Sequence, residues 1–309
     1  MKVFVAGATG ALGVPVVKLL VGAGHDVTGL TRSETKRATL EKLGAKAAVG
    51  DVLDAAAVER AVGEAKPESI VSLLTRLPKN GPTRMRHMRP NARVHREGTR
   101  NIVRAGQASG VERIVAESVL FRYGYGELKP MLTEEDPAPQ TLPGPTNEPL
   151  AGVVALEDAV LGVGGIVLRY GLFYGPGASH MNFLTKMLRR RMMRLPGGDR
   201  GALSFIHMDD AASATVAALE RGHGPAIYNV CDDEPASFAA FIREVARGIG
   251  AKPPSSVPLG LAKLVMPYGV MAMTGRVTMS NAKAKRELGW TPRYPSIREG
   301  LSGMSRSQA

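Results

Sequence analysis

The sequence predicts an α/β protein, a doubly wound parallel sheet with a smaller, mostly helical lobe. Three observations support this prediction. Strand-like and helix-like segments alternate over the first 230 residues, a glycine-rich turn follows the first strand, and Pro/Gly-rich segments interrupt the alternation mainly later. At 309 residues the chain is also long for one compact core, so it has room for a second lobe.

The expected elements alternate in order. Strands are expected at 2–6, 26–31, 46–49, 69–74, 112–117, 165–170 and 226–230, and helices at 11–24, 34–43, 54–64, about 90–109, 150–163 and 208–221. Because a strand, a helix and a further strand form a parallel unit, this order predicts a parallel sheet with helices on both faces. Segments rich in Pro and Gly, which mark departures from the sheet, occupy 137–149, 175–177, 196–201 and 253–258.

These departures predict a second lobe interleaved with the first. A nucleotide-binding domain is expected over 1–171 together with 206–230, and a substrate-binding lobe over 172–205 and 231–309. Apolar side chains crowd 181–193 and 259–273, where Pro267 and Gly269 divide the second stretch into two short helices. These side chains form either an ordinary core or a Met-rich lid over a large, flat, apolar substrate.

The first strand runs straight into a glycine-rich turn and then a helix. Glycines at three-residue intervals allow a tight turn, a pyrophosphate at the helix N-terminus and close packing of helix on strand. The pattern therefore predicts a Rossmann fold that binds a dinucleotide. The residues expected to line that site are Gly7, Thr9, Gly10, Ala11, Leu12 and Gly13.

The tip of the second strand indicates which dinucleotide is bound. An NAD-selective site usually has an acidic residue there, whereas this chain has Arg32, Ser33 and Lys36. These side chains favour a ribose 2′-phosphate, so NADP(H) is expected, with NAD(H) possible. The alternative interpretation is that they are ordinary exposed residues at the start of a helix. After the third strand, Asp51 and Val52 are expected beside the adenine. After the fourth, Leu74 and Thr75 are expected under the ribose and phosphates.

The net charge of +12 comes largely from arginines crowded over 84–104 and 189–194. These residues form solvated helix faces, attract an anionic cofactor or acidic substrate, or contact nucleic acid. The third reading is disfavoured, because only 5% of residues are aromatic and no nucleic-acid-binding module is recognisable. We expect no nucleic-acid partner. We expect a small-molecule substrate, and the oligomeric state stays open.

Other features concern location and metals. A lone cysteine, Cys231, excludes an intrachain disulfide and suits a reducing cytosol, so a cytoplasmic location is expected. The apolar stretch 259–273 is too short and interrupted for a membrane span. His207, Asp209 and Asp210 do not make a closed metal site. No metal is predicted, and Asp209 or Asp210 is expected to cap a helix.

Several motifs in the right order resemble one family. They are the glycine turn at 7–13 (GxxGxxG), Gly50–Asp54 (GDxxD), Glu97–Ile102, Leu168–Pro176, Ile206–Ala212 and Leu288–Pro292. Together they resemble the extended and atypical short-chain dehydrogenase/reductases, the NAD-dependent epimerase/dehydratase group. The resemblance implies that Tyr170, Gly171 and Leu172 carry the chain past the nicotinamide.

The chain departs from that family where its chemistry usually lies. The family's Tyr-x-x-x-Lys pair exchanges a proton with the substrate oxygen. Alignment on Pro149 and Glu157 places Leu150 and Val154 where the tyrosine and lysine belong. A literal copy of the pattern at 125–129 is followed by Pro130 and is expected to be a loop.

The resemblance leaves Ser118 and Tyr123 as catalytic candidates, although Ser118 could be only a strand-end residue. His95 falls where the family often has asparagine, as either an active-site group or an ordinary histidine. Water, Tyr170 or an acidic group of the substrate are further possible proton sources.

The resemblance implies an NADPH-dependent ketoreductase acting on a bulky, polycyclic aromatic ketone. The chain is similar to atypical reductases that tailor aromatic polyketides, such as angucyclinone ketoreductases of the simocyclinone type. This similarity points to antibiotic biosynthesis. The alternatives are a sugar-nucleotide epimerase or reductase of the same family and a non-catalytic NADP(H)-sensing protein.

Overall fold

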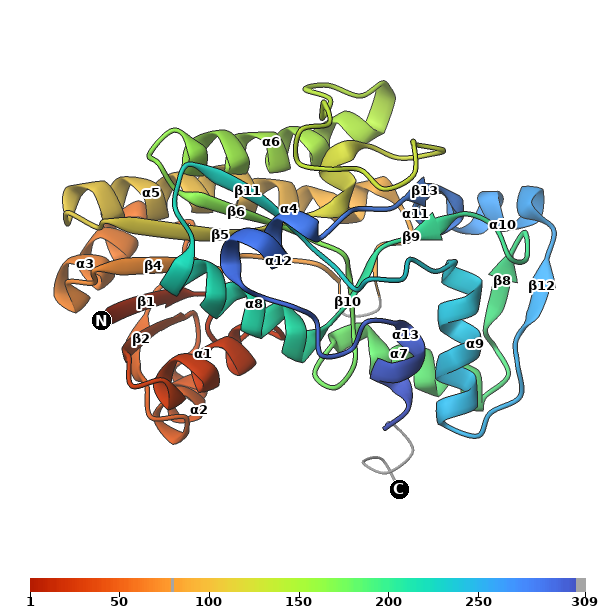
Figure 1. The fold of residues 1–309 in the computed structure, drawn as a ribbon, viewed down its shortest axis with the longest axis horizontal. Helices are drawn as coiled ribbons and strands as arrows, with labels where there is room; N and C mark the ends of the chain where they lie inside the picture. Colours follow the sequence, from red (N-terminus) through yellow and green to blue (C-terminus); the bar gives the residue numbers. More distant parts are fainter. Residues whose placement is uncertain (79–80, 304–309) are drawn as a thin grey trace.

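The structure, a computed structural model, describes residues 1–78 and 81–303. Its centre is a parallel sheet of seven strands with the order β11-β6-β5-β4-β1-β2-β3 (Figure 1). The strands are β1 (Lys2–Ala6), β2 (Asp26–Thr31), β3 (Lys46–Val49), β4 (Ser69–Ser72), β5 (Arg113–Val119), β6 (Ile166–Tyr170) and β11 (Ala226–Val230). The predicted doubly wound α/β fold is confirmed.

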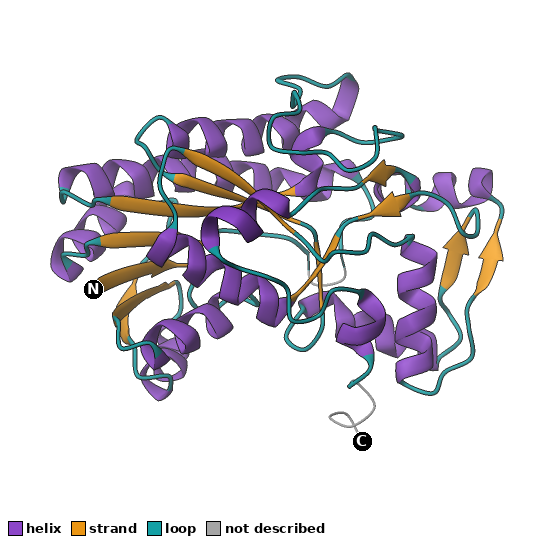
Figure 2. Cartoon of the chain, in the orientation of Figure 1, coloured by secondary structure: helices purple, strands orange, loops and turns teal. Residues whose placement is uncertain are grey.

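Helices cover both faces of the sheet, and each layer closes a hydrophobic core (Figure 2). One face packs against α1 (Gly13–Gly22), α2 (Arg37–Lys42), α8 (Met208–Arg221) and α12 (Ala282–Leu288). The other packs against α3 (Ala55–Ala65), α5 (Thr99–Ala108) and α6 (Asn147–Leu161), and α4 (Arg89–Arg93) packs on α6. We call these the α1/α8 face and the α5/α6 face. Successive strand residues point to alternate faces, so this distinction decides which side chains can meet.

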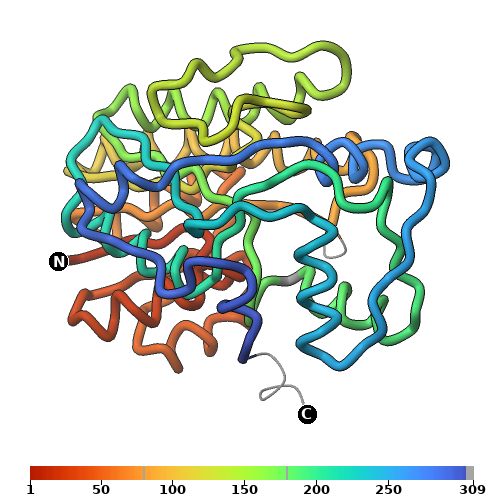
Figure 3. The backbone as a smooth tube through the Cα atoms, turned by 45° about the vertical axis from the view of Figure 1, so that its right-hand side comes forward, coloured from red at the N-terminus to blue at the C-terminus, as the bar shows by residue number. Residues whose placement is uncertain are grey.

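The second lobe consists of short parallel strand pairs and helices. The pairs are β7 (Leu172–Tyr174) with β10 (Phe205–His207), β8 (Arg194–Pro196) with β12 (Ser255–Val257), and β9 (Ala202–Leu203) with β13 (Arg276–Val277). Its helices are α7 (Ser179–Arg189), α9 (Phe238–Gly248), α10 (Leu259–Val265), α11 (Pro267–Thr274) and α13 (Ile297–Leu301). The predicted pair of short helices in 259–273 is confirmed. From this lobe the C-terminal stretch returns to the sheet, where α12 packs against α8 and β11 (Figure 3).

Several predicted boundaries differ from the observed ones, by up to three residues at the start of α6, which begins at Asn147 rather than residue 150. Three further differences bear on the site. The fourth strand ends at Ser72 rather than residue 74, and the chain beyond it is held at Arg76, whose N–H donates to Asn91 Oδ1 (2.7 Å). The helix predicted over 34–43 begins as a 3-10 turn, where the hydroxyl groups of Ser33 and Thr35 bond to each other (2.6 Å). Local side-chain bonds of this kind compete with a regular helix start. The helix predicted near 90–109 contains a π turn over Val94–Gly98 between α4 and α5.

No helix within residues 1–78 and 81–303 has both the length and the apolar composition needed to cross a bilayer.

Candidate active site

The glycine turn after β1 contains two positions that only glycine can occupy. Gly7 has a φ of +84°, and a Cβ there would overlap the carbonyl group of Leu73 at the end of β4. A Cβ on Gly13 would overlap the carbonyl oxygen of Gly7. The turn is closed by a hydrogen bond from Gly10 N–H to Gly7 O (2.9 Å). The backbone therefore folds as tightly as the sequence pattern predicts.

The N-terminus of α1 is suited to an anionic group. Leu12 precedes the helix without a side-chain cap, and the first turn contains no acidic residue. Thr9, Gly10 and Ala11 lie at the partly or fully exposed rim of the turn. Backbone N–H groups at such an end attract phosphate, so the residues present fit a dinucleotide.

The expected adenine and ribose residues lie on two loops that meet the start of α5. A Cβ on Gly98 would lie 3.1 Å from Val52 and 3.5 Å from Leu74, so this glycine brings the loops together. Asn101 Nδ2 donates to Val52 O (2.9 Å) and fixes the loop after β3. Asp51 and Thr75 are exposed at the same edge of the sheet. The motifs at 50–54 and 97–102 therefore support each other structurally.

The tip of β2 presents cationic side chains to solvent. Arg32 and Lys36 are exposed, and the neighbouring carboxylate of Glu34 is paired with Arg37. Within residues 1–78 and 81–303 no acidic side chain pairs with Arg32. Ser33 bonds to Thr35 rather than to either cation.

Helix α6 packs on β5 and β6 and contains neither tyrosine nor lysine. Its Glu157, 2% exposed, accepts hydrogen bonds from Ser118 Oγ (2.7 Å), Arg122 Nε (3.1 Å) and Arg169 (2.9 and 2.6 Å). We call these four residues the Glu157 cluster. Leu150 is buried one turn from the start of α6, and Val154 is half-buried further along. Ser118 therefore binds a buried carboxylate on the α5/α6 face.

The other predicted hydroxyl groups are also engaged within the protein. Tyr123 donates to Thr133 O (2.9 Å) and Asn229 Oδ1 (3.0 Å), and burial raises its pKa. Tyr170 is fully buried, its hydroxyl lies 2.7 Å from Thr215 Oγ1, and burial raises its pKa strongly.

Gly171 and Leu172 lead the chain from β6 into the second lobe. Gly171 N–H donates to Val230 O (3.0 Å) and Leu172 N–H to Ser204 O (2.9 Å). A Cβ on Gly171 would lie 2.8 Å from the Phe205 backbone, so the two segments cross closely there.

His95 lies in the π turn and is 4% exposed. Its Nε2 lies 3.3 Å from Asn91 Nδ2, and burial lowers its pKa to about 4. The ring is therefore neutral at physiological pH.

The Tyr125–Lys129 segment is a loop, as predicted. Lys129 pairs with Asp136, whereas the Tyr125 ring stacks on Phe121 (centroids 4.8 Å apart) and meets Tyr268 of α11 edge-on (6.0 Å). We call Phe121, Tyr125 and Tyr268 the aromatic trio. It joins the segment after β5 to the second lobe.

The expected cap at the start of α8 was wrong. His207, not Asp209 or Asp210, caps the helix, because its Nδ1 accepts from Asp209 N–H (3.2 Å). Asp210 instead accepts from the N–H groups of Arg293 and Tyr294 (both 2.9 Å) and ties the C-terminal stretch to α8. In the part of the chain that the structure describes, no three His, Cys, Asp or Glu side chains gather to hold a metal.

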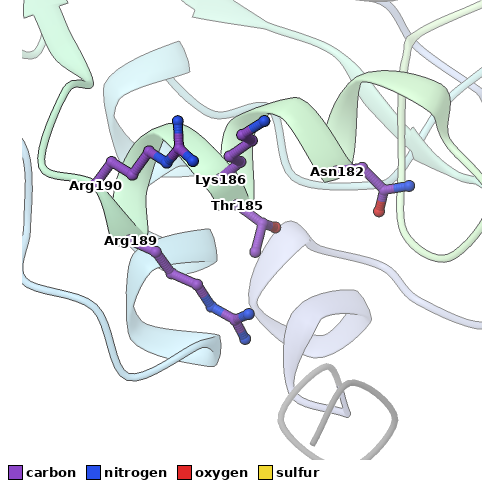
Figure 4. A pocket seen from close by; sticks show the side chains of 5 residues that line it. All are labelled: Asn182, Thr185, Lys186, Arg189 and Arg190. Carbon is purple, nitrogen blue, oxygen red and sulfur yellow. The ribbon is translucent and has the colours of Figure 1, made fainter.

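The two arginine-rich segments, 84–104 and 189–194, make different contacts. Along 84–104, Arg89 pairs with Glu148 (3.0 Å), Arg93 with Glu97 (2.9 Å) and Arg104 with Glu59 (3.3 Å). On α7, a pocket of about 440 Å³ is lined by Asn182, Thr185, Lys186, Arg189 and Arg190. Figure 4 shows the guanidinium groups of its two arginines on different sides of the helix, so they do not converge on one point.

Sequence reasoning missed Glu117, which precedes Ser118 and points to the opposite, α1/α8 face of the sheet. Its neighbours on that face of β5, Val115 and Val119, belong to the apolar core there. Burial raises the pKa of Glu117 to about 8. A single carboxyl among apolar residues at 114–119 was the available signal.

A parallel sheet with a glycine turn, an uncapped helix N-terminus and a lobe over the same edge is typical of proteins that bind a dinucleotide. Residues 3–231 match the NAD dependent epimerase/dehydratase family. The chain belongs to this family and is an enzyme of the NAD(P)-dependent oxidoreductase class.

Relatives of similar length extend this comparison. The chain is 37% identical over 312 residues to a 3-diazoavenalumate denitrifying reductase from a Streptomyces species, covering 97% of this chain and 99% of the relative. It is 24% identical to a 4-hydroxy-2-methyl-3-oxo-4-farnesyl-3,4-dihydroquinoline-1-oxide ketoreductase from Stigmatella aurantiaca, covering 98% and 96%.

Solved structures share the fold. UDP-glucose 4-epimerase from Thermotoga maritima superposes with a TM-score of 0.80 at 20% identity, covering 99% of this chain and 97% of that one. The Thermus thermophilus UDP-glucose 4-epimerase in complex with NAD gives 0.76 at 23% identity, covering 99% and 100%.

Proposed function

We propose that this enzyme reduces a bulky aromatic ketone with NADPH and without the family's Tyr/Lys acid. The observation that carries the proposal is an intact glycine turn beside a helix α6 that lacks both tyrosine and lysine. When bound, the cofactor would supply the hydride, held by the turn at 7–13 and the loops after β3 and β4. An epimerase or dehydratase must deprotonate its substrate before oxidising it, so it needs a base as well as an acid, and a plain reductase tolerates this loss best.

Arg32 supports the choice of NADPH. Its guanidinium is exposed at the tip of β2 and unpaired within residues 1–78 and 81–303, while Glu34 is occupied by Arg37. A planar guanidinium binds phosphate oxygens with charge-assisted hydrogen bonds.

The second lobe supports an apolar, aromatic substrate. Leu261, Leu264 and Val265 of α10 are 60%, 78% and 69% exposed, and the aromatic trio lies between α11 and the segment after β5. Exposed apolar side chains in a lobe beside a cofactor site favour a flat apolar ligand. The ketoreductase relative acts, by its name, on a farnesylated oxo-quinoline oxide.

A second candidate substrate is an aryl diazo compound, favoured by the 37% identical denitrifying reductase. An aryl diazonium cation and a hydride give an arene and dinitrogen. That balance contains no proton, so it would also explain a helix α6 without tyrosine and lysine.

The test is NADPH oxidation by the purified protein with a panel of acceptors, with NADH in parallel. Turnover of polycyclic phenolic ketones with NADPH preferred is the expected result. Turnover confined to a diazophenolic acid would establish the second candidate. Turnover of sugar-nucleotide ketones, or tight NADPH binding without turnover of any acceptor, would overturn the proposal in favour of the epimerase-type or sensing alternatives.

A further inference from the structure

The proposed reduction needs a proton for the substrate oxygen, and the hydroxyl groups of Ser118, Tyr123 and Tyr170 are engaged inside the protein. Glu117 is different. Its side chain is partly exposed, and no described residue donates a hydrogen bond to its carboxyl group or forms an ion pair with it. A largely buried carboxyl without a partner has no neighbour that stabilises its charge.

Glu117 lies at the carboxyl edge of the sheet, close to the glycine turn. Ser72 of β4 pairs with Ala116 of β5, so Leu73 and Glu117 are the next residues along two adjacent strands. Leu73 is the residue whose carbonyl group a Cβ on Gly7 would overlap. Ligands of open parallel sheets bind outside the carboxyl ends of the strands, and this places Glu117 one strand from the turn that would hold the cofactor.

We propose that Glu117 is the acid that protonates the substrate oxygen in this enzyme. The proposal rests on the reductase function above. The carboxyl O–H bond breaks and the proton forms an O–H bond with the oxygen of the ketone, which gains an electron pair as its carbon is reduced by the nicotinamide cofactor. The resulting carboxylate regains a proton from solvent.

The surroundings of Glu117 keep it protonated near neutral pH. Burial raises the pKa of Glu117 to about 8. Among the described residues, the titratable group that interacts with Glu117 is the Tyr170 phenol, whose pKa is raised mainly by burial and further by a charge on Glu117. The buried residues of α1 and α8 are apolar or carry a hydroxyl, such as Val17, Ala214 and Thr215, except for Asp210, whose carboxylate is bonded to the C-terminal stretch. A general acid works best when its pKa lies near the working pH.

The first test is independent of turnover. Infrared difference spectra of the cofactor-free protein, wild type minus Glu117→Gln, are expected to show one protonated carboxyl that titrates near pH 8. Glu112→Gln, an exposed carboxyl at the start of the same strand, is the matched control. Titration of Glu117 below pH 5 would overturn the proposal.

The second test uses the ketone found with the acceptor panel. Glu117→Gln is expected to lower kcat by about 10²–10⁴-fold, while NADPH binding measured by fluorescence stays unchanged. Glu117→Asp should recover part of the lost kcat. The wild-type kcat should fall above about pH 8. A Gln variant with kcat within threefold of wild type would overturn the role of Glu117 while leaving the reductase function intact. A wild type that reduces no ketone would overturn both, even if the carboxyl titrates near pH 8.

Discussion

Glu157 of α6 and Arg169 of β6 form a two-point ion pair, with Nε–Oε1 and Nη2–Oε2 distances of 2.9 and 2.6 Å. Both residues are at most 3% exposed, and Arg122 and Ser118 bind the same carboxylate. The pair fixes the helix on which the family usually carries its catalytic tyrosine and lysine. Helix α6, which contains neither tyrosine nor lysine, is held on the sheet by this ion pair.

We expect Glu157→Gln to destabilise the protein by about 3–5 kcal/mol, because two buried guanidinium groups lose their counter-charge. Chemical denaturation measures the effect. Asp158→Asn, at the exposed neighbouring position of α6, should change the free energy of unfolding by less than about 0.5 kcal/mol. Equal effects of the two variants would contradict the role assigned to the ion pair.

Ser118→Ala should lower the free energy of unfolding by about 1.5–3 kcal/mol, because a buried hydrogen bond to a charged group is lost. The ketone kcat should stay within a few-fold of wild type at a temperature where the variant is folded. Denaturation and steady-state kinetics on one preparation separate the two effects. A hundredfold loss of kcat at full stability would instead make Ser118 catalytic.

Gly13→Ala should abolish dinucleotide binding and lower Tm, because its Cβ would overlap the Gly7 carbonyl oxygen. Gly22→Ala in the same helix is the matched control, since its Cβ would meet nothing within 4 Å. That control should raise stability by up to about 1 kcal/mol. NADPH binding by fluorescence and Tm by calorimetry check both variants. Full binding by Gly13→Ala would contradict the assigned cofactor site.

Arg32→Ala should weaken NADPH about 10- to 150-fold and leave NADH unchanged, because one charge-assisted contact to the 2′-phosphate is lost. The ratio of kcat/KM for the two cofactors is the measurement. Arg60→Ala, an exposed arginine on α3, should leave this ratio unaltered. Equal losses of kcat/KM with NADPH and NADH would contradict a contact between Arg32 and the 2′-phosphate.

His95 should make the protein less stable as the pH falls. The folded-state pKa is lowered to about 4, so between about pH 6.5 and 4 the unfolded chain binds a proton that the folded one does not. Stability from the neutral ring is therefore complete above pH 6.5 and is lost on acidification. His95→Gln should flatten this dependence in denaturation series at several pH values, whereas exposed His223→Gln should not.

Local patterns predicted the sheet and the glycine turn because both depend on neighbouring residues. The spacing of Gly7, Gly10 and Gly13 is enough to require the turn, and apolar runs are enough to place the strands. The π turn at 94–98 and the His207 cap depend on tertiary contacts that no local pattern contains.

The same dependence on tertiary contacts explains which parts of the candidate site the sequence did not predict. Ser118 follows the family motif, but its partner Glu157 lies 39 residues away, so the sequence could not show that its hydroxyl is occupied. Glu117 was missed for the opposite reason. The family resemblance gives it no role, and its significance comes from strand alternation and from the residues that surround it.

The order of the strands has a consequence for fragments of this protein. β11 borders β6, yet it follows β7, β8, β9 and β10 in the chain. A nascent chain or truncated product ending near residue 171 would therefore leave β6 as an open edge, and open edges pair with strands of other molecules. We expect such half-length products to aggregate, so library designs and split reporters should cut this chain elsewhere.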